Sequence, residues 1–377
     1  MFFNGFLKSF RILLIPFSIF YWVAIWVRNK LYDAGVFKSV SFNLPVINVG
    51  NLSVGGTGKS PMIEYLTRLL QNEQKISILS RGYKRKTKVY NLANEFSTAL
   101  EIGDEPLQFH KKFPGVAVAV GEERIVAIPQ LLHDRPETDV ILLDDAFQHR
   151  AIKAGLNILL TDCNNLFTRD FYLPAGDLRD LKKSYQRADI IVVTKCPFDL
   201  SQKAKEATVK EIDPLPHQHI FFTTIEFGLP YHILSYQQHK VINEQTEVLL
   251  VTGIANPGPL KNYLDEQCDL YNMMTYRDHH IFTIDDWKDI GKRFASMESQ
   301  DKIILTTEKD AMRLIKFESK AAELPLFVIP IEHRFLFNEG PQFDQLVTKF
   351  IEQFNPKNEV KGLQATILSS VDNQKVN

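Results

Sequence analysis

Cysteine is scarce in this sequence, and its few thiols are widely spaced. Cys163, Cys196 and Cys268 are the only cysteines among 377 residues, and no two of them form a C-x-x-C pair. An odd number of separated thiols argues against a disulfide framework and against a structural zinc site. We therefore expect a protein of a reducing compartment.

The chain also lacks an excess of charge of either sign. Lys and Arg together number 44, Asp and Glu 45, and the net charge is −1. A nucleic-acid-binding domain usually carries a basic surface, so we expect no nucleic-acid partner. No feature of the sequence indicates an obligate protein partner. The length and the balanced composition are typical of a globular protein with room for two domains.

Long apolar runs are absent except near the N-terminus. Residues 12–27 read ILLIPFSIFYWVAIWV, carry no charge and have basic residues on both sides. As a helix this run reaches about 24 Å, less than the roughly 30 Å of a bilayer core, and Pro16 weakens its first turns. We predict a hydrophobic membrane-anchor helix within residues 1–35, either spanning the bilayer or lying in its interface. A cleaved signal peptide and a buried core helix are the alternatives, and no A-x-A cleavage site follows the run.

A glycine-rich segment directly follows the apolar run 44–50 and precedes a helical pattern over 62–70. In such a loop the glycine N–H groups face phosphate oxygens, the lysine reaches the terminal phosphates, and the next hydroxyl ligates Mg²⁺. The anion lies at a helix N-terminus, which favours negative charge. The usual pattern begins with glycine, where this chain has serine. The predicted nucleotide-binding residues are Ser53, Val54, Gly55, Gly56, Thr57, Gly58, Lys59 and Ser60.

Short apolar runs alternate with helical patterns after this loop. They occupy residues 75–79, 116–120, 140–143, 156–160 and 190–193. This alternation predicts an α/β fold of the P-loop NTPase type, a mostly parallel sheet with helices on both faces. A second set of strand patterns follows a change near 221–230 and covers 248–252, 302–306 and 326–331, with helical patterns around 261–266 and 285–295.

We predict four segments from these patterns. They are a membrane anchor over 1–35, a P-loop core over 36–225, a smaller α/β domain over 226–355 and a frayed polar tail over 356–377.

Acidic residues stand at two places where a nucleotide-dependent reaction needs them. Asp144 and Asp145 end the buried-strand pattern that starts at Val140, as in a Walker B strand, so either could hold Mg²⁺ directly or through water. Asp104 and Glu105 stand at a turn entering a helix and could orient or deprotonate a hydroxyl nucleophile. A solvated strand end and a helix N-terminus that favours acids are the alternative interpretations.

Histidines and arginines supply further candidates. Asp278, His279 and His280 could supply a His–carboxylate catalytic pair or form a metal cluster, although adjacent residues converge poorly on one ion. Arg81 and Arg179 stand beside glycine turns and could bind an anionic substrate or lie on the surface.

The strand pattern 190–193 ends in Thr194-Lys195, where a GTPase carries an Asn-Lys-x-Asp motif. Thr194 and Pro197 replace the asparagine and the aspartate. This favours adenine, or no strong choice of base.

Seven segments in order resemble the tetraacyldisaccharide 4'-kinase family of lipid A biosynthesis. They are residues 49–57, 80–83, 103–106, 144–150, 173–179, 278–280 and 307–310. The resemblance implies transfer of the ATP γ-phosphate, with Mg²⁺, to the 4'-hydroxyl of a tetraacyl disaccharide 1-phosphate, which forms lipid IVA. It places the enzyme at the cytoplasmic face of the inner membrane, where the acylated substrate resides.

The resemblance also implies roles for individual residues. Asp104 resembles the catalytic base and His279 its partner from the second domain, with His280 left open, so that the two domains would close for catalysis. Lys59 is a catalytic and phosphate-binding residue. The implied Mg²⁺ residues are Ser60, Asp144, Asp145 and Glu105, and the implied substrate-binding residues are Arg81, Tyr83, His149 and Arg179. The alternatives are a P-loop kinase of another membrane lipid and a membrane-tethered nucleotide-dependent switch.

Overall fold

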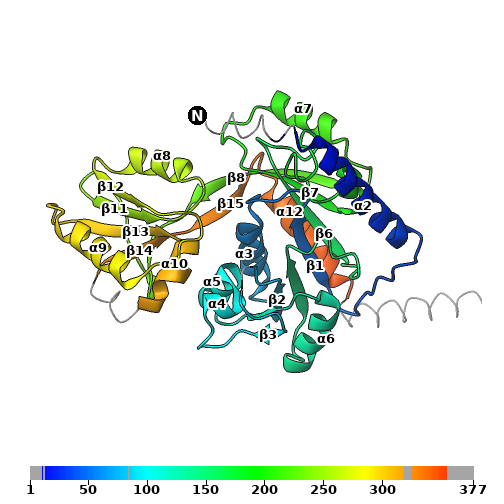
Figure 1. Ribbon diagram of the computed structural model, residues 1–377, viewed down its shortest axis with the longest axis horizontal. Coiled ribbons are helices and arrows are strands. Elements are labelled where there is room, and N and C mark those ends of the chain that lie inside the picture. Colours follow the sequence, from blue (N-terminus) through cyan, green and yellow to red (C-terminus); the bar gives the residue numbers. More distant parts are fainter. Residues whose placement is uncertain (1–10, 12, 84, 318–323, 355–377) are drawn as a thin grey trace, which may run out of the picture. The chain divides into compact units, whose positions relative to one another are not determined.

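The computed structural model describes residues 11, 13–83, 85–317 and 324–354. The predicted tail 356–377 and the first ten residues of the predicted anchor lie outside this range. The chain forms two compact units, each assembled from separate segments (Figure 1). The first comprises Met1–Arg81, Glu123–Thr224 and His333–Asn377, and the second comprises Gly82–Glu122 and Ile225–Glu332.

Seven neighbouring strands of a nine-stranded sheet follow the order β15-β8-β7-β6-β1-β5-β2. These strands are β1 (Val46–Asn51), β2 (Ile76–Ser80), β5 (Val140–Asp144), β6 (Leu156–Asp162), β7 (Ile190–Thr194), β8 (His219–Phe227) and β15 (Ile331–Phe335). β1 pairs in parallel with β5 and β6, and the β2–β5, β6–β7 and β7–β8 pairs are also parallel. Strands β1, β2, β5 and β7 are buried throughout, which explains why they read as continuous apolar runs. The predicted mostly parallel sheet is confirmed.

Five α-helices of the described chain belong to the first unit. They are α2 (Ile15–Asp33), α3 (Lys59–Leu70), α6 (Arg124–Asp134), α7 (Gln202–Ile212) and α12 (Gly340–Glu352), with a 3₁₀ helix over Lys182–Arg187. α12 packs on the unit through Phe343, whose ring lies 5.5 Å from that of Phe221 in β8. The C-terminal segment therefore belongs to the first unit.

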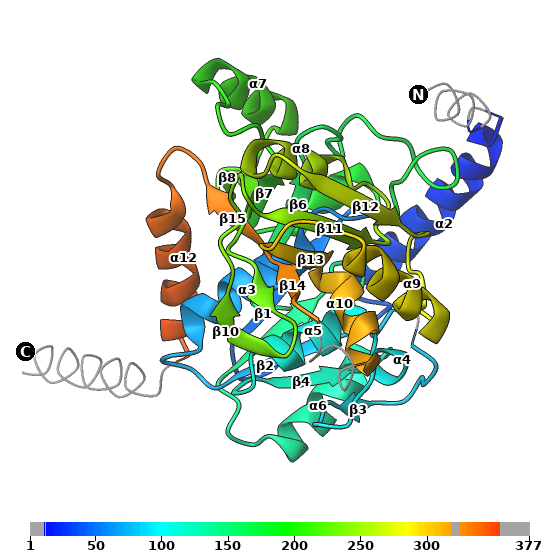
Figure 2. The ribbon, with the colours of Figure 1, turned by 90° about the vertical axis from the view of Figure 1, so that its left-hand side faces the viewer.

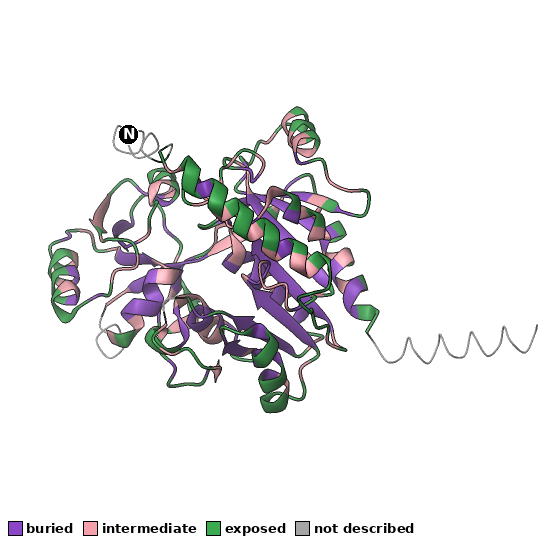
Figure 3. Ribbon diagram, turned by 45° about the vertical axis from the view of Figure 1, so that its right-hand side comes forward, coloured by how far each residue is buried: buried purple, intermediate pink, exposed green. Residues whose placement is uncertain are grey.

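Helix α2 corresponds to the predicted anchor and is unusual in what it exposes. Most of its residues are solvent-accessible, and the helix is largely coloured as exposed in Figure 3. Ser18 and Asn29 are its buried residues, whereas Phe17 and Phe20 are 62% and 75% exposed. Among the residues described by the structure, no helix combines the length and the apolar character needed to cross a bilayer.

The second unit contains a six-stranded sheet of order β10-β9-β14-β13-β11-β12, most of which can be followed in Figure 2. The strands are β9 (Tyr231–His232), β10 (Ser235–His239), β11 (Glu247–Thr252), β12 (Tyr271–Thr275), β13 (Lys302–Thr307) and β14 (Leu326–Ile329). β11 pairs in parallel with β12 and β13, and β13 with β14. Its helices are α8 (Gly258–Gln267), α9 (Ile284–Ala295) and α10 (Glu308–Leu314), followed by a 3₁₀ helix over Ile315–Phe317.

Residues 82–122 complete the second unit. They form α4 (Ala99–Ile102), α5 (Asp104–Lys112) and the short antiparallel pair β3 (Asn91–Leu92) and β4 (Ala117–Val120). α5 and α10 are joined by ion pairs, including Lys112–Glu308 at 2.5 Å and Lys309–Glu105 at 2.9 Å. These contacts group α5 with the later part of the chain. The compact units are therefore discontinuous in sequence, unlike the contiguous segments 36–225 and 226–355 predicted above.

Most of the predicted strands and helices are present, with one difference at the end of the second set. The predicted strand 326–331 is interrupted, because β14 ends at Ile329 and β15 begins at Ile331. Pro330 stands between them and has no N–H group for a sheet hydrogen bond. The interruption also marks where the chain returns to the first unit.

Candidate active site

The phosphate loop lies between β1 and α3 in the first unit, as predicted. Gly55 and Gly58 have φ angles of +107° and +86°, which side-chain-bearing residues rarely adopt. A Cβ atom added at Gly55 or Gly56 meets nothing within 4 Å. The space beside the loop is thus open, and the loop backbone and the N-terminus of α3 fit a bound phosphate group.

Two strand ends hold the middle of this loop. Asn51, at the end of β1, donates a hydrogen bond from Nδ2 to Oγ1 of Thr57 at 2.9 Å. Thr194, at the end of β7, donates from Oγ1 to the carbonyl oxygen of Thr57, also at 2.9 Å. Asn51 and Thr194 are fully buried. Thr194 therefore contacts the phosphate loop. In the sequence, Thr194 takes the place of the asparagine of the GTPase Asn-Lys-x-Asp motif, and that comparison did not suggest this role.

A third contact to the loop comes from His333, which the sequence analysis did not assign to the site. Its Nε2 lies 2.8 Å from the carbonyl oxygen of Gly58, and its Nδ1 lies 3.0 Å from Oγ1 of Thr223. Burial lowers the pKa of His333 to about 4, so the ring is neutral at neutral pH. Because a carbonyl oxygen only accepts, Nε2 is the donor and Nδ1 accepts from the Thr223 hydroxyl. The one signal available was a histidine two residues after the predicted strand pattern 326–331.

The two predicted Walker B aspartates stand at the end of β5. Asp144 is 2% exposed and accepts a hydrogen bond from Oγ of Ser80 at 2.9 Å. Asp145 lies 3.7 Å from Nζ of Lys59. Burial tends to raise the pKa of Asp145, but Lys59 and Arg179 outweigh it and lower the pKa to about 2. An ionised Asp145 thus lies beside the lysine of the phosphate loop.

Carboxylate and hydroxyl oxygens of this kind suit Mg²⁺, which usually binds to one or two carboxylates and to substrate phosphates. Ser60, Asp144 and Asp145 all belong to the first unit. No group of three or more His, Cys, Asp or Glu residues within the described chain could hold a metal ion. The residues present fit a Mg²⁺ ion shared with a nucleotide.

Arg179, predicted to bind substrate, is engaged within the protein. Its Nη1 donates to Oδ2 of Asp145 at 3.0 Å, and its Nη2 contacts both Oδ1 of Asp145 and Oδ1 of Asn51. This paired geometry is the strong, two-point form of an arginine–carboxylate interaction. In this structure Arg179 fixes the Walker B carboxylate, and its predicted contact to substrate stays a prediction.

His149 and Arg81, two further predicted substrate residues, share a cationic environment in the first unit. Burial lowers the pKa of His149 to about 4, with added contributions from Arg124, Arg81 and Arg28. The histidine is therefore neutral at neutral pH while positive charges surround it. Such a cluster suits an anionic group.

The second unit contains the other predicted catalytic residues. Asp104 begins α5, and His279 adopts a left-handed backbone conformation with a φ of +61°. Nδ1 of His279 lies 3.5 Å from Oδ2 of Asp104. The sequence analysis assigned these residues to different domains, but they lie in the same compact unit. The reason is the pairing of α5 with α10, which no local sequence pattern indicates.

Arg313 lies between these two residues and was missed by the sequence analysis. Its Nε lies 3.1 Å from Oδ2 of Asp104, and its Nη2 lies 2.7 Å from Nδ1 of His279. Arg313 follows Asp310 by three residues on α10, and its Nη1 lies 3.4 Å from Oδ1 of that residue. Acidic and basic residues at this spacing share a helix face, which was the signal available.

The contacts of the two histidines show which of them lies beside Asp104. His280 points to Asp286, with 2.9 Å between Nε2 and Oδ2, and its ring stacks on Tyr276. His279, not His280, is therefore next to Asp104, and the two histidines do not converge on one ion. The ring of Tyr83 lies 6.3 Å from that of His279.

Glu105, a predicted Mg²⁺ residue, accepts a hydrogen bond from Nζ of Lys309 at 2.9 Å. It belongs to the second unit, whereas Asp144 and Asp145 belong to the first.

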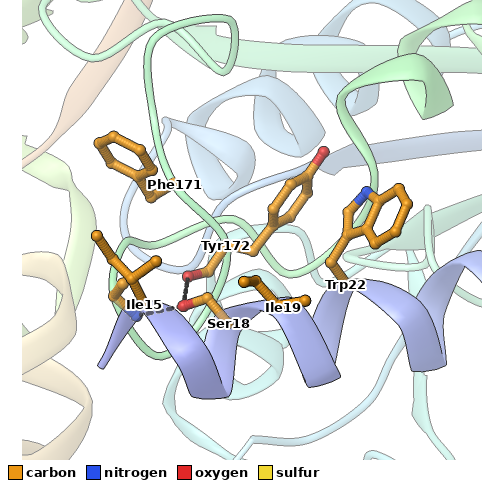
Figure 4. Close-up of a pocket in the computed structure, with 7 residues that line it drawn as sticks. Ile15, Ser18, Ile19, Trp22, Phe171 and Tyr172 are labelled. Atoms are coloured by element: carbon orange, nitrogen blue, oxygen red, sulfur yellow. Dashed lines mark hydrogen bonds between the residues drawn. The ribbon is translucent and has the colours of Figure 1, made fainter. Parts of the chain in front are cut away.

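An apolar pocket lies beside α2 in the first unit (Figure 4). Its lining consists of Ile15, Ser18, Ile19, Trp22, Phe171, Tyr172 and Ala175, and its volume is about 220 Å³. The Ser18 hydroxyl donates to the carbonyl oxygen of Tyr172 at 2.9 Å and accepts from the N–H of Ala175 at 3.0 Å. These hydrogen bonds attach α2 to the loop that contains Tyr172 and Ala175, and they leave apolar side chains around the pocket.

Comparisons with known proteins agree across nearly the whole chain. The family model Tetraacyldisaccharide-1-P 4'-kinase matches residues 10–352. A tetraacyldisaccharide 4'-kinase of Bacteroides thetaiotaomicron is 42% identical over 353 residues, covering 90% of this chain and 93% of the relative. One of Flavobacterium psychrophilum is 44% identical over 347 residues, covering 90% and 96%. The crystal structure of LpxK from Aquifex aeolicus in complex with ATP is similar with a TM-score of 0.71 and 29% identity, covering 91% and 99%.

Proposed function

This chain belongs to the tetraacyldisaccharide-1-P 4'-kinase family, and on that premise we propose that it transfers the γ-phosphoryl group of ATP to the 4'-hydroxyl of a tetraacyl disaccharide 1-phosphate. The observation that carries the proposal is the open phosphate loop beside Asp144 and Asp145. The names of the relatives supply the acceptor. Lipid IVA, the product of this transfer, belongs to lipid A biosynthesis.

The first unit supplies the residues that would hold ATP and Mg²⁺. The loop N–H groups and Lys59 would bind the phosphates, and Ser60, Asp144 and Asp145 would ligate the metal. When bound, Mg²⁺ neutralises negative charge that develops on the transferred phosphoryl group. Lys59 lies 3.7 Å from Asp145 in this structure, so its ammonium group is already held at the loop.

The second unit supplies the group that would activate the acceptor. Asp104 takes the proton of the 4'-hydroxyl while that oxygen forms its bond to the γ-phosphorus, and the bond from phosphorus to ADP breaks. His279 is the proposed partner of Asp104 and lies beside it, with 3.5 Å between Nδ1 of His279 and Oδ2 of Asp104. Tyr83, Arg81, His149 and Arg179 are the proposed contacts to the substrate.

We further propose that α2 attaches the protein to the cytoplasmic face of the inner membrane. A surface helix of a water-soluble protein usually turns its apolar residues toward the core. Helix α2 instead buries Ser18 and Asn29 and exposes Phe17 and Phe20. Exposed apolar side chains with basic residues nearby suit an interface with anionic lipid. Attachment there would bring the enzyme to a substrate whose acyl chains stay in the bilayer.

Phosphate transfer in detergent micelles tests the proposal. Purified protein, radiolabelled ATP and a tetraacyl disaccharide 1-phosphate should yield a labelled lipid, and Asp104→Ala should lower the rate by about 10²-fold or more while ATP still binds. Wild-type protein that binds ATP but labels no lipid would contradict the proposed acceptor. In that case a kinase of another membrane lipid, or a nucleotide-dependent switch, becomes the better interpretation.

A further inference from the structure

Arg313 contacts both groups on which the proposed phosphoryl transfer depends, and the inference drawn from it rests on that proposed function. Its Nε lies 3.1 Å from Oδ2 of Asp104, and its Nη2 contacts the same oxygen. The same Nη2 lies 2.7 Å from Nδ1 of His279. We propose that Arg313 is the positioning residue that fixes the carboxylate of Asp104 and the tautomer of His279.

The tautomer follows from the chemistry of the guanidinium group. Arginine has five N–H donors and no acceptor, so Nδ1 of His279 accepts the hydrogen bond and carries no proton. The ring proton of His279 is therefore on Nε2. The 3.5 Å contact between Nδ1 of His279 and Oδ2 of Asp104 has no proton to share. Arg313, not a direct hydrogen bond, holds the two side chains together.

Arg313 also distinguishes the two oxygens of Asp104. Its Nε and Nη2 both bind Oδ2, and no hydrogen bond from the described residues reaches Oδ1. The side chain of Asp104 is 20% exposed, so the carboxylate remains accessible. The geometry leaves Oδ1 to receive the proton of an acceptor hydroxyl while Oδ2 stays fixed.

The guanidinium itself is held by a buried anchor. The side chain of Arg313 is 8% exposed, and Asp310 beside it is fully buried. Oδ2 of Asp310 accepts hydrogen bonds from the N–H of Gly253 at 2.9 Å and from Oγ1 of Thr307 at 2.8 Å. The ends of β11 and β13 therefore orient Asp310, Asp310 orients Arg313, and Arg313 orients Asp104 and His279. A lysine cannot make the same forked contact, because its donors share one nitrogen.

Kinetics of Arg313 variants provide the first test. We expect Arg313→Gln to lower kcat by about 10- to 100-fold, since a misplacement of about 1 Å can cost a factor of 10², with the ATP dissociation constant unchanged. Arg313→Lys should recover part of that loss. Arg293→Gln is the matched control, because Arg293 is an exposed arginine of the same unit that binds Asn272 at 2.8 Å. Wild-type kcat in Arg313→Gln, or a loss shared equally by ATP binding and thermal stability, would overturn the proposal.

The ring protonation of His279 provides a second test, which needs no acceptor lipid. Protein labelled with ¹⁵N at histidine is examined by NMR at pH 8, where a free imidazole is neutral, and His279→Gln identifies the signals. Wild type should show Nε2 protonated and Nδ1 unprotonated, and Arg313→Gln should show a mixture of tautomers. Identical tautomers in both proteins would contradict the role of Arg313. Absence of phosphate transfer by wild type would instead contradict the proposed function.

Discussion

His333 donates a hydrogen bond from Nε2 to the carbonyl oxygen of Gly58 across 2.8 Å. The same carbonyl accepts from the N–H of Met62 at 3.2 Å, within the first turn of α3. Because a trans peptide group is planar, its C=O and N–H point in opposite directions. Fixing the carbonyl of Gly58 toward the helix therefore directs the N–H of Lys59 toward the phosphate loop.

This relationship predicts that His333 supports nucleotide binding without touching the nucleotide. His333→Leu removes the donor, and we expect ATP affinity to fall about tenfold, which equals about 1.4 kcal/mol. His333→Gln can keep an N–H near the position of Nε2, so its affinity should lie between those of wild type and His333→Leu. Isothermal titration with ATP gives the affinities, and thermal melting checks that each variant is folded. Equal ATP affinity in all three proteins would contradict this role.

The neutral state of His333 also predicts a pH dependence of stability. Its pKa is lowered to about 4 by burial, while an unfolded histidine titrates near 6.5. Between these values the unfolded chain binds a proton that the folded chain does not, so the free energy of unfolding falls as the pH is lowered from about 6.5 to about 4. The full contribution is on the order of 3 kcal/mol. Below the folded-state pKa no further loss arises from this group.

Urea unfolding at pH 7.0 and 5.0 measures this effect. The difference in the free energy of unfolding between the two pH values should be smaller in His333→Gln than in wild type, because glutamine does not titrate. His149→Gln serves as a comparison, since the pKa of His149 is also lowered to about 4. An unchanged pH dependence in His333→Gln would show that His333 is not neutral in the folded protein.

The local patterns of the sequence predicted the strands and the phosphate loop well. Residues 140–143 and 190–193 read as apolar runs and form β5 and β7, because a parallel strand covered on both faces leaves no polar alternation. The phosphate loop was equally clear, since its glycines allow the positive φ angles that this short segment of backbone requires. These features depend on neighbours in sequence.

Contacts between distant segments could not be predicted in the same way. Asp104 and Arg313 are 209 residues apart, and nothing in either segment identifies the other as its partner. The same limit applies to Arg179, whose bond to Asp145 is a tertiary contact, and to His333, which returns from the end of the second unit to the phosphate loop. The predicted contiguous domains differ from the compact units for the same reason. Patterns of hydrophobicity indicate strands and helices, but not the point at which the chain returns from one unit to the other.

We predict that Ser80 stabilises the carboxylate of Asp144, one of the two Walker B residues. Its hydroxyl donates to Oδ2 of the buried Asp144 at 2.9 Å. Ser80→Ala removes this donor, and hydrogen bonds to charged groups contribute about 1.5–3 kcal/mol. We expect a lower melting temperature and a higher Mg²⁺ concentration for half-maximal phosphate transfer.

Ser77→Ala is the matched control for Ser80→Ala. Ser77 lies on the same strand β2, is 1% exposed, and its hydroxyl is 2.8 Å from that of Thr138. Its replacement should lower stability without changing the Mg²⁺ dependence. If both variants shift the Mg²⁺ dependence equally, Ser80 acts only through the packing of β2.

We predict that membrane binding depends on the exposed phenylalanines of helix α2. Phe17 and Phe20 are 62% and 75% exposed, so replacing both by serine should change the free energy of unfolding by no more than about 0.5 kcal/mol each. Burying one such side chain in an apolar phase contributes about 1.5–3 kcal/mol, so the double variant should bind vesicles of anionic lipid at least about tenfold more weakly. Sedimentation with vesicles measures this binding.

Phe198→Ser is the control for the phenylalanines of α2, because Phe198 belongs to the same unit and is 64% exposed, but lies outside α2. It should leave vesicle binding unchanged. Phosphate transfer to a soluble, short-chain acceptor should be the same in the α2 variant and in wild type, whereas transfer to a substrate embedded in vesicles should fall. A loss of both activities would mean that α2 supports the fold of the first unit, and unchanged vesicle binding would contradict its role as the attachment to the membrane.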